Sequence, residues 1–325
     1  MSDSAKGQQD HAGEFLSSVD QTRRKGGAPS PQAVPRDAAT VILIREPAAR
    51  PFEVFLMRRH KDQDFMGGAY VFPGGRLDEG DCDPDLAALS EGLSPEQARG
   101  RLQEEALPPA RALGLFLAAL RETFEESGIL LARDASGKVV EMRDGADAGR
   151  FASYRLALHD RRLTLAELAR RENLRYALDL LFPYAHWITP EVEIRRFDTR
   201  FFVARQPDGQ WPVHDTIEMT KSVWIRPCEA LERYEAGEIL LMPPTLKTLD
   251  ELSRFRTAED LFEHVRSRKI EPLLPQAFSF EGGYGIRLPY DPQYTIAPYK
   301  LPSRPGEPSR ILLLDGRWRI SWASD

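Results

Sequence analysis

The segment RETFEESGIL, residues 121–130, combines a predicted helix end with closely spaced carboxylates. In a helix, Glu122, Glu125 and Glu126 occupy positions i, i+3 and i+4, so their side chains share one face. Like charges at this spacing destabilise a helix by about 0.2–0.5 kcal/mol per pair. Gly128 predicts that the helix ends directly after them, where the helix dipole also disfavours negative charge. Such repulsion indicates that a cation binds the cluster.

A glutamate-rich helix end is more commonly a solvated surface, but the neighbouring sequence argues against that reading. The carboxylates directly continue the apolar segment ALGLFLAAL (112–120), which predicts a buried helix, and the acidic, glycine-rich loop PGGRLDEGD (73–81) ends a predicted strand. Carboxylate oxygens without a nearby histidine favour Mg²⁺ or Mn²⁺ over Zn²⁺. The sequence therefore predicts a divalent-cation site suited to phosphate chemistry.

The chain of 325 residues with 42% apolar content is long enough to bury a sizeable core. We expect residues 1–36 to form a disordered tail, 37–230 a core domain and 231–325 a helical and partly irregular extension packed on the core. Strands alternating with helices predict an α/β sandwich around a mixed sheet. The predicted strands are 38–46, 52–60, 69–75, 184–190, 195–205 and 220–227, and the strongest predicted helix is 110–127.

Composition excludes several classes of protein. The net charge of −6 argues against a nucleic-acid partner, and two distant cysteines, Cys82 and Cys228, argue against a disulfide framework or a cysteine-based zinc site. The polar start MSDSAKGQQDHAGEF contains no apolar signal core, and no segment approaches the ~20 apolar residues that span a bilayer. We therefore expect a cytoplasmic protein that binds no membrane; an oligomer remains possible.

The acidic segment resembles the second half of the Nudix box. Gly75, five residues and Asp81 resemble the first half, with Asp where the family has Glu, and Arg121-Glu122-Thr123-Phe124-Glu125-Glu126-Ser127-Gly128-Ile129 resembles the second, with Thr at one apolar position. Between the halves stand 39 residues (82–120) where seven are usual. Closing a longer excursion costs entropy that grows only slowly with length, so the halves still meet in space. The resemblance implies a Nudix-type α/β/α sandwich with a helical insertion inside the box.

The long insertion is similar to that of one branch, the acyl-coenzyme A diphosphatases of peroxisomal and mitochondrial type and their bacterial relatives. HWITPEVEIRRFDTRFF (186–202) and GEILLMPPTLKTLDEL (237–252) resemble that branch too. A coenzyme A signature precedes the box in such enzymes, and FLMRRHKDQDFMGGAYVFPGG (55–75) matches it in part. Its departures are His60, in place of Ser or Ala, and Asp64, in place of an arginine.

The resemblance implies roles for the box residues. Glu122, Glu125 and Glu126 would bind Mg²⁺ or Mn²⁺, and Asp81 would hold a metal-bound water unless it is only a structural acid of the loop. Arg121 would act with Glu122 in catalysis by orienting the carboxylates, and a plain helix ion pair is its alternative. Gly74 and Gly75 would bring the loop close to the helix and the substrate, and a plain turn is their alternative.

The resemblance also implies a general base and phosphate ligands. Glu218 lies where many members of the family place a late acidic residue, and Glu191 is its rival; a surface carboxylate is the alternative for each. The candidates for binding the phosphates of the substrate are Arg58, Arg59, Arg195 and Arg196, because arginine forks match phosphate geometry. Phe72, a residue of the partly matched coenzyme A signature, is a further substrate candidate. Neighbouring residues on a strand point to opposite sides, so we expect about half of these arginines to be bystanders.

Three functions follow from these patterns. The first is metal-dependent hydrolysis of coenzyme A or acyl-coenzyme A to a 4′-phosphopantetheine derivative and adenosine 3′,5′-bisphosphate, with an acyl groove near residues 85–107. The second keeps the chemistry but takes ADP-ribose, NADH or a dinucleoside polyphosphate, an alternative that the Asp64 departure leaves open. The third is a non-catalytic nucleotide-binding module, against which the retained glutamates argue.

Overall fold

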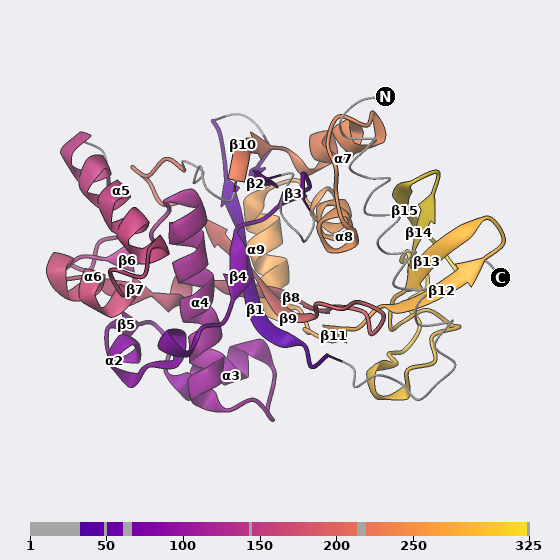
Figure 1. Ribbon diagram of the computed structural model, residues 1–325, viewed down its shortest axis with the longest axis horizontal. Coiled ribbons are helices and arrows are strands. Elements are labelled where there is room, and N and C mark those ends of the chain that lie inside the picture. Colours follow the sequence, from indigo (N-terminus) through magenta and orange to yellow (C-terminus); the bar gives the residue numbers. More distant parts are fainter. Residues whose placement is uncertain (1–32, 49–50, 61–66, 143–144, 213–218, 324–325) are drawn as a thin grey trace.

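A computed structural model describes residues 33–48, 51–60, 67–142, 145–212 and 219–323. A mixed β-sheet occupies the centre of the molecule, with helices on both of its faces (Figure 1). The fold is therefore the predicted α/β/α sandwich. In the described part of the chain, no helix is both long and apolar enough to cross a bilayer.

The central sheet has eight strands in the order β10-β2-β1-β9-β8-β11, with β3 paired to β2 and β4 paired to β1. Strands β1 and β9 pair in parallel along their whole length, and β8 and β11 also pair in parallel, while the other neighbours are antiparallel. The strands are β1 (Arg36–Arg45), β2 (Glu53–Arg59), β3 (Tyr70–Val71), β4 (Gly74–Arg76), β8 (Phe182–Ile188), β9 (Phe197–Arg205), β10 (Met219–Ile225) and β11 (Pro272–Leu273).

One long helix, α4, covers one face of this sheet, and α7, α8 and α9 cover the other (Figure 1). The helical segments of the first half are η1 (Glu79–Cys82), α2 (Pro84–Ala87), α3 (Pro95–Leu102), α4 (Pro109–Ser127), α5 (Gly145–His159), α6 (Leu165–Glu172) and η2 (Leu178–Leu180). Those of the second half are α7 (Pro227–Glu235), α8 (Pro243–Leu252), α9 (Ala258–Ser267) and η3 (Ala297–Tyr299).

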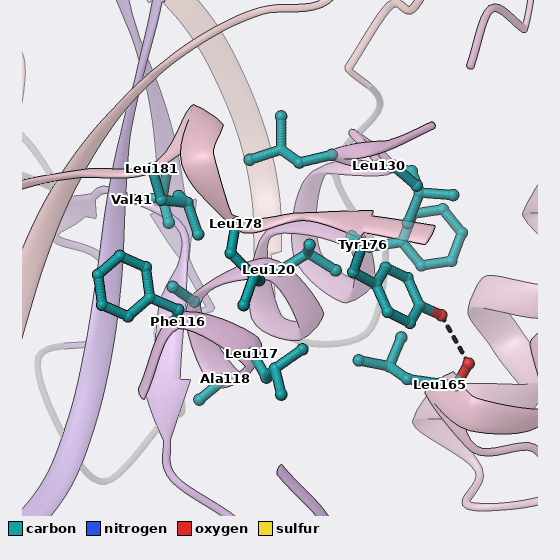
Figure 2. Packing of buried hydrophobic residues seen from close by; sticks show 14 of the residues in the cluster. Val41, Phe116, Leu117, Ala118, Leu120, Leu130, Leu165, Tyr176, Leu178 and Leu181 are labelled. Carbon is teal, nitrogen blue, oxygen red and sulfur yellow. Dashed lines mark hydrogen bonds between the residues drawn. The ribbon is translucent and has the colours of Figure 1, made fainter. Parts of the chain in front are cut away.

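Each face of the sheet buries its own apolar core, because side chains alternate along a strand. In β1, Val41 and Leu43 pack with α4, whereas Ile42 and Ile44 belong to the core that includes α7, α8 and α9. Figure 2 shows the α4 side, where the Tyr176 hydroxyl donates a hydrogen bond of 2.6 Å to the Leu165 carbonyl. This two-sided burial explains why β1 has a continuous apolar sequence.

The insertion between the two halves of the box folds against the sheet through a buried ion pair. It holds α2, α3 and the strand β5 (Ser90–Glu91), which joins β7 (Arg175–Ala177) and β6 (Ala132–Arg133) in a small sheet. Arg200, on β9, donates to both carboxylate oxygens of Glu104 at 2.9 and 2.6 Å. The insertion is thus an ordered layer that returns the chain to the start of α4.

The C-terminal extension is more regular than expected. After α8 and α9 it forms a four-stranded antiparallel sheet, which lies at the opposite end of the molecule from α5 and α6 (Figure 1). The expectation of a helical and irregular extension is therefore wrong for residues 276–287 and 310–321, each of which forms an antiparallel hairpin, whereas residues 288–309 contain only the short helix η3. The strands are β12 (Gln276–Phe280), β13 (Gly283–Arg287), β14 (Arg310–Leu314) and β15 (Arg317–Ser321).

Candidate active site

The acidic cluster lies in the last turns of α4, as its sequence predicts. Gly128 ends the helix with a φ of 77°, and its N–H donates to the Phe124 carbonyl at 2.9 Å. Thr123, which replaces an apolar residue of the box, is fully buried, and its hydroxyl donates to the Ala119 carbonyl at 2.7 Å. That bond satisfies the hydroxyl, so threonine is tolerated in the apolar interior.

An arginine from outside the box neutralises the negative end of the α4 dipole. Arg155, on α5, donates from Nε to the Glu125 carbonyl at 2.6 Å and from Nη2 to the Glu126 carbonyl at 2.5 Å. These are two of the carbonyls that a helix end leaves without a partner. Arg155 therefore satisfies two of the backbone carbonyls at the end of α4.

Arg121 is the cation that the carboxylates share. It donates from Nε and Nη2 to the two oxygens of Asp81 at 2.8 and 2.9 Å, and from Nη1 to Glu122 at 2.8 Å. Its Nη1 also lies 3.5 Å from a Glu125 oxygen. Asp81 is 2% exposed, and both of its oxygens face Arg121. The structure thus places Asp81 as the residue that orients Arg121, and its predicted role in holding a metal-bound water remains a prediction.

The loop after β3 is tied directly to the acidic helix. The Gly74 N–H donates to Glu126 Oε2 at 2.7 Å, which joins residues that are 52 positions apart. A Cβ added at Gly75 would lie 2.3 Å from Glu122 Oε1, and one added at Gly74 would lie 2.4 Å from the Ala39 carbonyl oxygen. Glycine is therefore required at Gly74, which lies against the backbone of β1, and at Gly75 any side chain would displace the Glu122 carboxylate.

The cluster carries more negative charge than its arginine balances. Burial raises the pKa of Glu122 to about 7; Arg121 opposes this rise and Glu125 adds to it. Burial also raises the pKa of Glu125. For Arg121, burial alone would lower the pKa, but its bonds with Asp81 and the neighbouring carboxylates raise it, so the guanidinium stays charged.

These residues fit a divalent cation by their chemistry. The donors are hard carboxylate oxygens. The positive charge of such an ion would balance the excess negative charge that these carboxylates share. Gly75 keeps open the space beside Glu122 that any side chain would fill. Within the described ranges, no three His, Cys, Asp or Glu side chains are already gathered around one point as metal ligands. Glu122 and Glu126 bond to Arg121 and to the Gly74 N–H instead.

A cavity of about 910 Å³ begins at this cluster. Glu122 and Glu126 line it, and so does Arg59, whose Nε is buried without a hydrogen-bond partner among the described residues. An unsatisfied guanidinium nitrogen beside carboxylates is suited to a phosphate oxygen. The other predicted residues that line the cavity are Phe72, Gly74, Gly75, Arg195 and Arg196.

Other predicted residues lie elsewhere. Arg58 is not among the lining residues, which is the pattern expected of the strand neighbour of Arg59. Glu191 is exposed and not among them either, whereas Glu193 of the same loop is. Arg196 is buried, and its guanidinium donates to the Thr189 and Ala33 carbonyls at 3.1 Å each. Glu218 lies outside the described residues.

Sequence reasoning missed part of the cavity wall. Arg36, at the start of β1, and Arg76, at the end of β4, line it. The position of Arg76 directly after Gly74-Gly75 was the signal that could have indicated it. Arginines 195 and 196 both line the cavity because they precede β9, so the alternation expected of a strand does not apply. A further wall comes from the C-terminal extension, through Met242–Thr245, Pro275, Ile286 and Trp318.

Comparison with known proteins identifies the family. Residues 35–255 match the family described as the NUDT19 Nudix domain. The acyl-coenzyme A diphosphatase NUDT19 of Xenopus laevis is 27% identical over 76% of this chain and 72% of its own length. The human protein of the same name is 29% identical over 77% of this chain and 74% of its own length.

A solved structure supports the same assignment. A NUDIX hydrolase from Alicyclobacillus acidocaldarius is 30% identical, with a TM-score of 0.56 over 71% of this chain and 96% of that chain. The matched family residues span the box glycines, the inserted segment and the acidic helix. This chain therefore belongs to the Nudix hydrolases, in the NUDT19 Nudix domain family.

Proposed function

We propose that this Nudix hydrolase cleaves the diphosphate of coenzyme A or its acyl esters. Water attacks one phosphorus, the bond between that phosphorus and the bridging oxygen breaks, and one proton is released. The products are a 4′-phosphopantetheine derivative and adenosine 3′,5′-bisphosphate. The observation that carries the proposal is a cavity that joins the acidic helix to five arginines: Arg36, Arg59, Arg76, Arg195 and Arg196.

Glu122, Glu125 and Glu126 would hold Mg²⁺ or Mn²⁺ as the cofactor. Such an ion, when bound, stabilises charge on phosphate oxygens and lowers the pKa of water. Arg121 orients the carboxylate of Glu122 and is itself held by Asp81. Arg59 would bind a phosphate oxygen through its unsatisfied Nε. The proton of the attacking water would pass to an acid beyond α4: Glu191 and Glu218 are the candidates from the sequence, and Glu193 is the one that lines the cavity.

The choice of coenzyme A over other diphosphates is supported by the relatives. The Xenopus and human proteins are named as acyl-coenzyme A diphosphatases, and each alignment covers about three quarters of both chains. The surplus of arginines also suits a substrate with a third phosphate, at the 3′ position, beyond the two that are cleaved. We further propose a cytoplasmic setting, with which the free cysteines Cys82 and Cys228 are compatible.

A substrate panel tests this proposal. The purified protein, with Mg²⁺ or Mn²⁺, is incubated separately with coenzyme A, acyl-coenzyme A, ADP-ribose, NADH and a dinucleoside polyphosphate. Mass spectrometry is expected to find adenosine 3′,5′-bisphosphate from coenzyme A or its esters. AMP from ADP-ribose or NADH, with coenzyme A left intact, would instead support the alternative Nudix substrates and refute the proposed one.

Gly75→Ala is expected to lower kcat by about 10²-fold, because a Cβ 2.3 Å from Glu122 Oε1 forces the carboxylate or the loop to move by about an ångström. Gly80→Ala is the matched control, since its Cβ would meet nothing within 4 Å. The assay compares kcat and KM of both variants with the parent on the best substrate of the panel. Equal activity of the two variants would show that the approach of Gly75 to Glu122 is not needed.

A further inference from the structure

The lining of the cavity differs between two parts of the chain: the described residues up to Arg196 contribute both charged and apolar side chains, and those from Phe197 onward contribute no charged one. Its charged lining residues, among those the structure describes, all precede Phe197. The lining residues from Phe197 onward carry no charge: they are aromatic or aliphatic side chains, prolines and two threonines. The second part is built mainly by the C-terminal extension, through the start of α8, Pro275, Ile286 on β13 and Trp318 on β15.

The start of α8 offers an anion fewer N–H donors than a usual helix N-terminus. A helix N-terminus normally offers free N–H groups that bind phosphate. Here Met242 is the N-cap residue without a side-chain capping bond, and Pro243 and Pro244 occupy the first two helical positions. Proline has no N–H, so two of the usual donors are replaced by pyrrolidine rings. All three residues line the cavity, which makes this helix end an apolar surface.

Two exposed apolar side chains also line the cavity. Ile194, in the loop between β8 and β9, is 75% exposed, and Val34 is 84% exposed. Both line the same cavity. Single exposed apolar residues are common, but two that line the same cavity as the apolar residues of the extension indicate a surface that a flexible apolar group covers.

We propose that the C-terminal extension forms the subsite for the pantetheine arm and acyl chain of the substrate, so that the enzyme prefers acyl esters to free coenzyme A. This inference rests on the proposed function. It assigns each half of the substrate to a different set of residues that line the cavity. The nucleotide half carries all the negative charge and pairs with the arginines, whereas the arm is neutral and pairs with the uncharged wall. None of residues 85–107 lines the cavity, so this proposal replaces the expected acyl groove near those residues with a subsite in the extension.

Met242→Asp is the central variant. Aspartate is a preferred N-cap residue, so the helix is expected to remain stable while a charge enters the apolar wall. The loss of kcat/KM is expected to be about tenfold larger on decanoyl-coenzyme A than on free coenzyme A, because free coenzyme A has the arm but lacks the acyl chain. Met242→Leu, which conserves volume and polarity, is the matched control and is expected to match the parent. Ile194→Ser, at an exposed position, is expected to show a loss that increases with acyl length.

A binding measurement separates failure of this inference from failure of the proposed function. Octanoyl-pantetheine carries the arm without the nucleotide, and its binding to the full chain is measured by the fluorescence of Trp187 and Trp318, which line the cavity. Saturable quenching that Met242→Asp weakens about tenfold supports the subsite even if the panel finds another diphosphate. No quenching, or rates that do not depend on acyl length in parent and variants, overturns the subsite while cleavage of coenzyme A still supports the function.

Discussion

Glu126→Gln is expected to lower kcat by about 10³-fold or more, because the divalent ion that we propose there would lose a ligand, and such an ion stabilises several kcal/mol of transition-state charge. Glutamine keeps an oxygen that accepts the Gly74 N–H, so the tie between the loop and α4 is retained. The variant also removes one carboxylate from a crowded, buried cluster. Its melting temperature without metal is therefore expected to equal or exceed that of the parent, and the rise caused by Mg²⁺ or Mn²⁺ to disappear.

Glu79→Gln is the matched control for this experiment. Glu79 is an exposed acid of the same loop, in η1, and removing its charge is expected to leave both kcat and the metal-induced rise in melting temperature unchanged. Activity is measured with the best substrate of the panel, and metal binding by thermal shift. If Glu126→Gln retains parental kcat, the metal site does not depend on this carboxylate and our assignment is wrong.

The box residues could be predicted because their signals are local. The acidic face, the apolar run before it and the glycine after it all lie within α4, and the structure has this helix at 109–127 where 110–127 was expected. Contacts between distant residues could not be read in the same way. Arg121 and Asp81 are 40 positions apart, and nothing in their spacing shows that the aspartate serves the arginine.

The C-terminal sheet contained one signal that was overlooked. Asp315-Gly316 lies between β14 and β15, and both residues have positive φ, of 49° and 74°. An Asp-Gly pair between two apolar runs is a strong hairpin signal, and RILLLDGRWRIS (310–321) contains it. The sequence contains no comparable signal that this sheet lines the cavity. Trp318 and Glu122 line the same cavity only because the tertiary fold brings these distant residues to it.

The second large effect is expected in the network that joins the extension to the central sheet. Lys247, on α8, is 1% exposed, and its ammonium donates to Glu251 Oε1 at 2.9 Å. Glu251 Oε2 accepts from the Tyr184 hydroxyl, on β8, at 2.8 Å and from Arg268 at 3.1 Å. Glu251 is thus the one carboxylate that these three donors share, and its removal leaves a buried ammonium without its closest partner.

Glu251→Gln is expected to reduce the free energy of unfolding at pH 7 by about 3 kcal/mol. Burial opposes ionisation of Glu251, but Arg268, Lys247 and Tyr184 outweigh it and hold its pKa at about 2. Unfolded chains release this carboxyl proton near pH 4.3. The folded-state pKa is the lower one, so the stabilisation is complete above about pH 5 and is lost as the pH falls towards 2.

Urea unfolding of parent and variant between pH 7 and pH 2 measures this difference. Glu229→Gln is the matched control, because Glu229 pairs with Arg233 at i+4 on the surface of α7, where such a pair contributes less than about 0.5 kcal/mol. The gap between parent and Glu251→Gln is expected to be constant above pH 5 and to close at lower pH. A gap as small as that of the control, or one that does not change with pH, would mean that apolar packing alone holds α8 on β8, and that the wall of the cavity does not depend on this carboxylate.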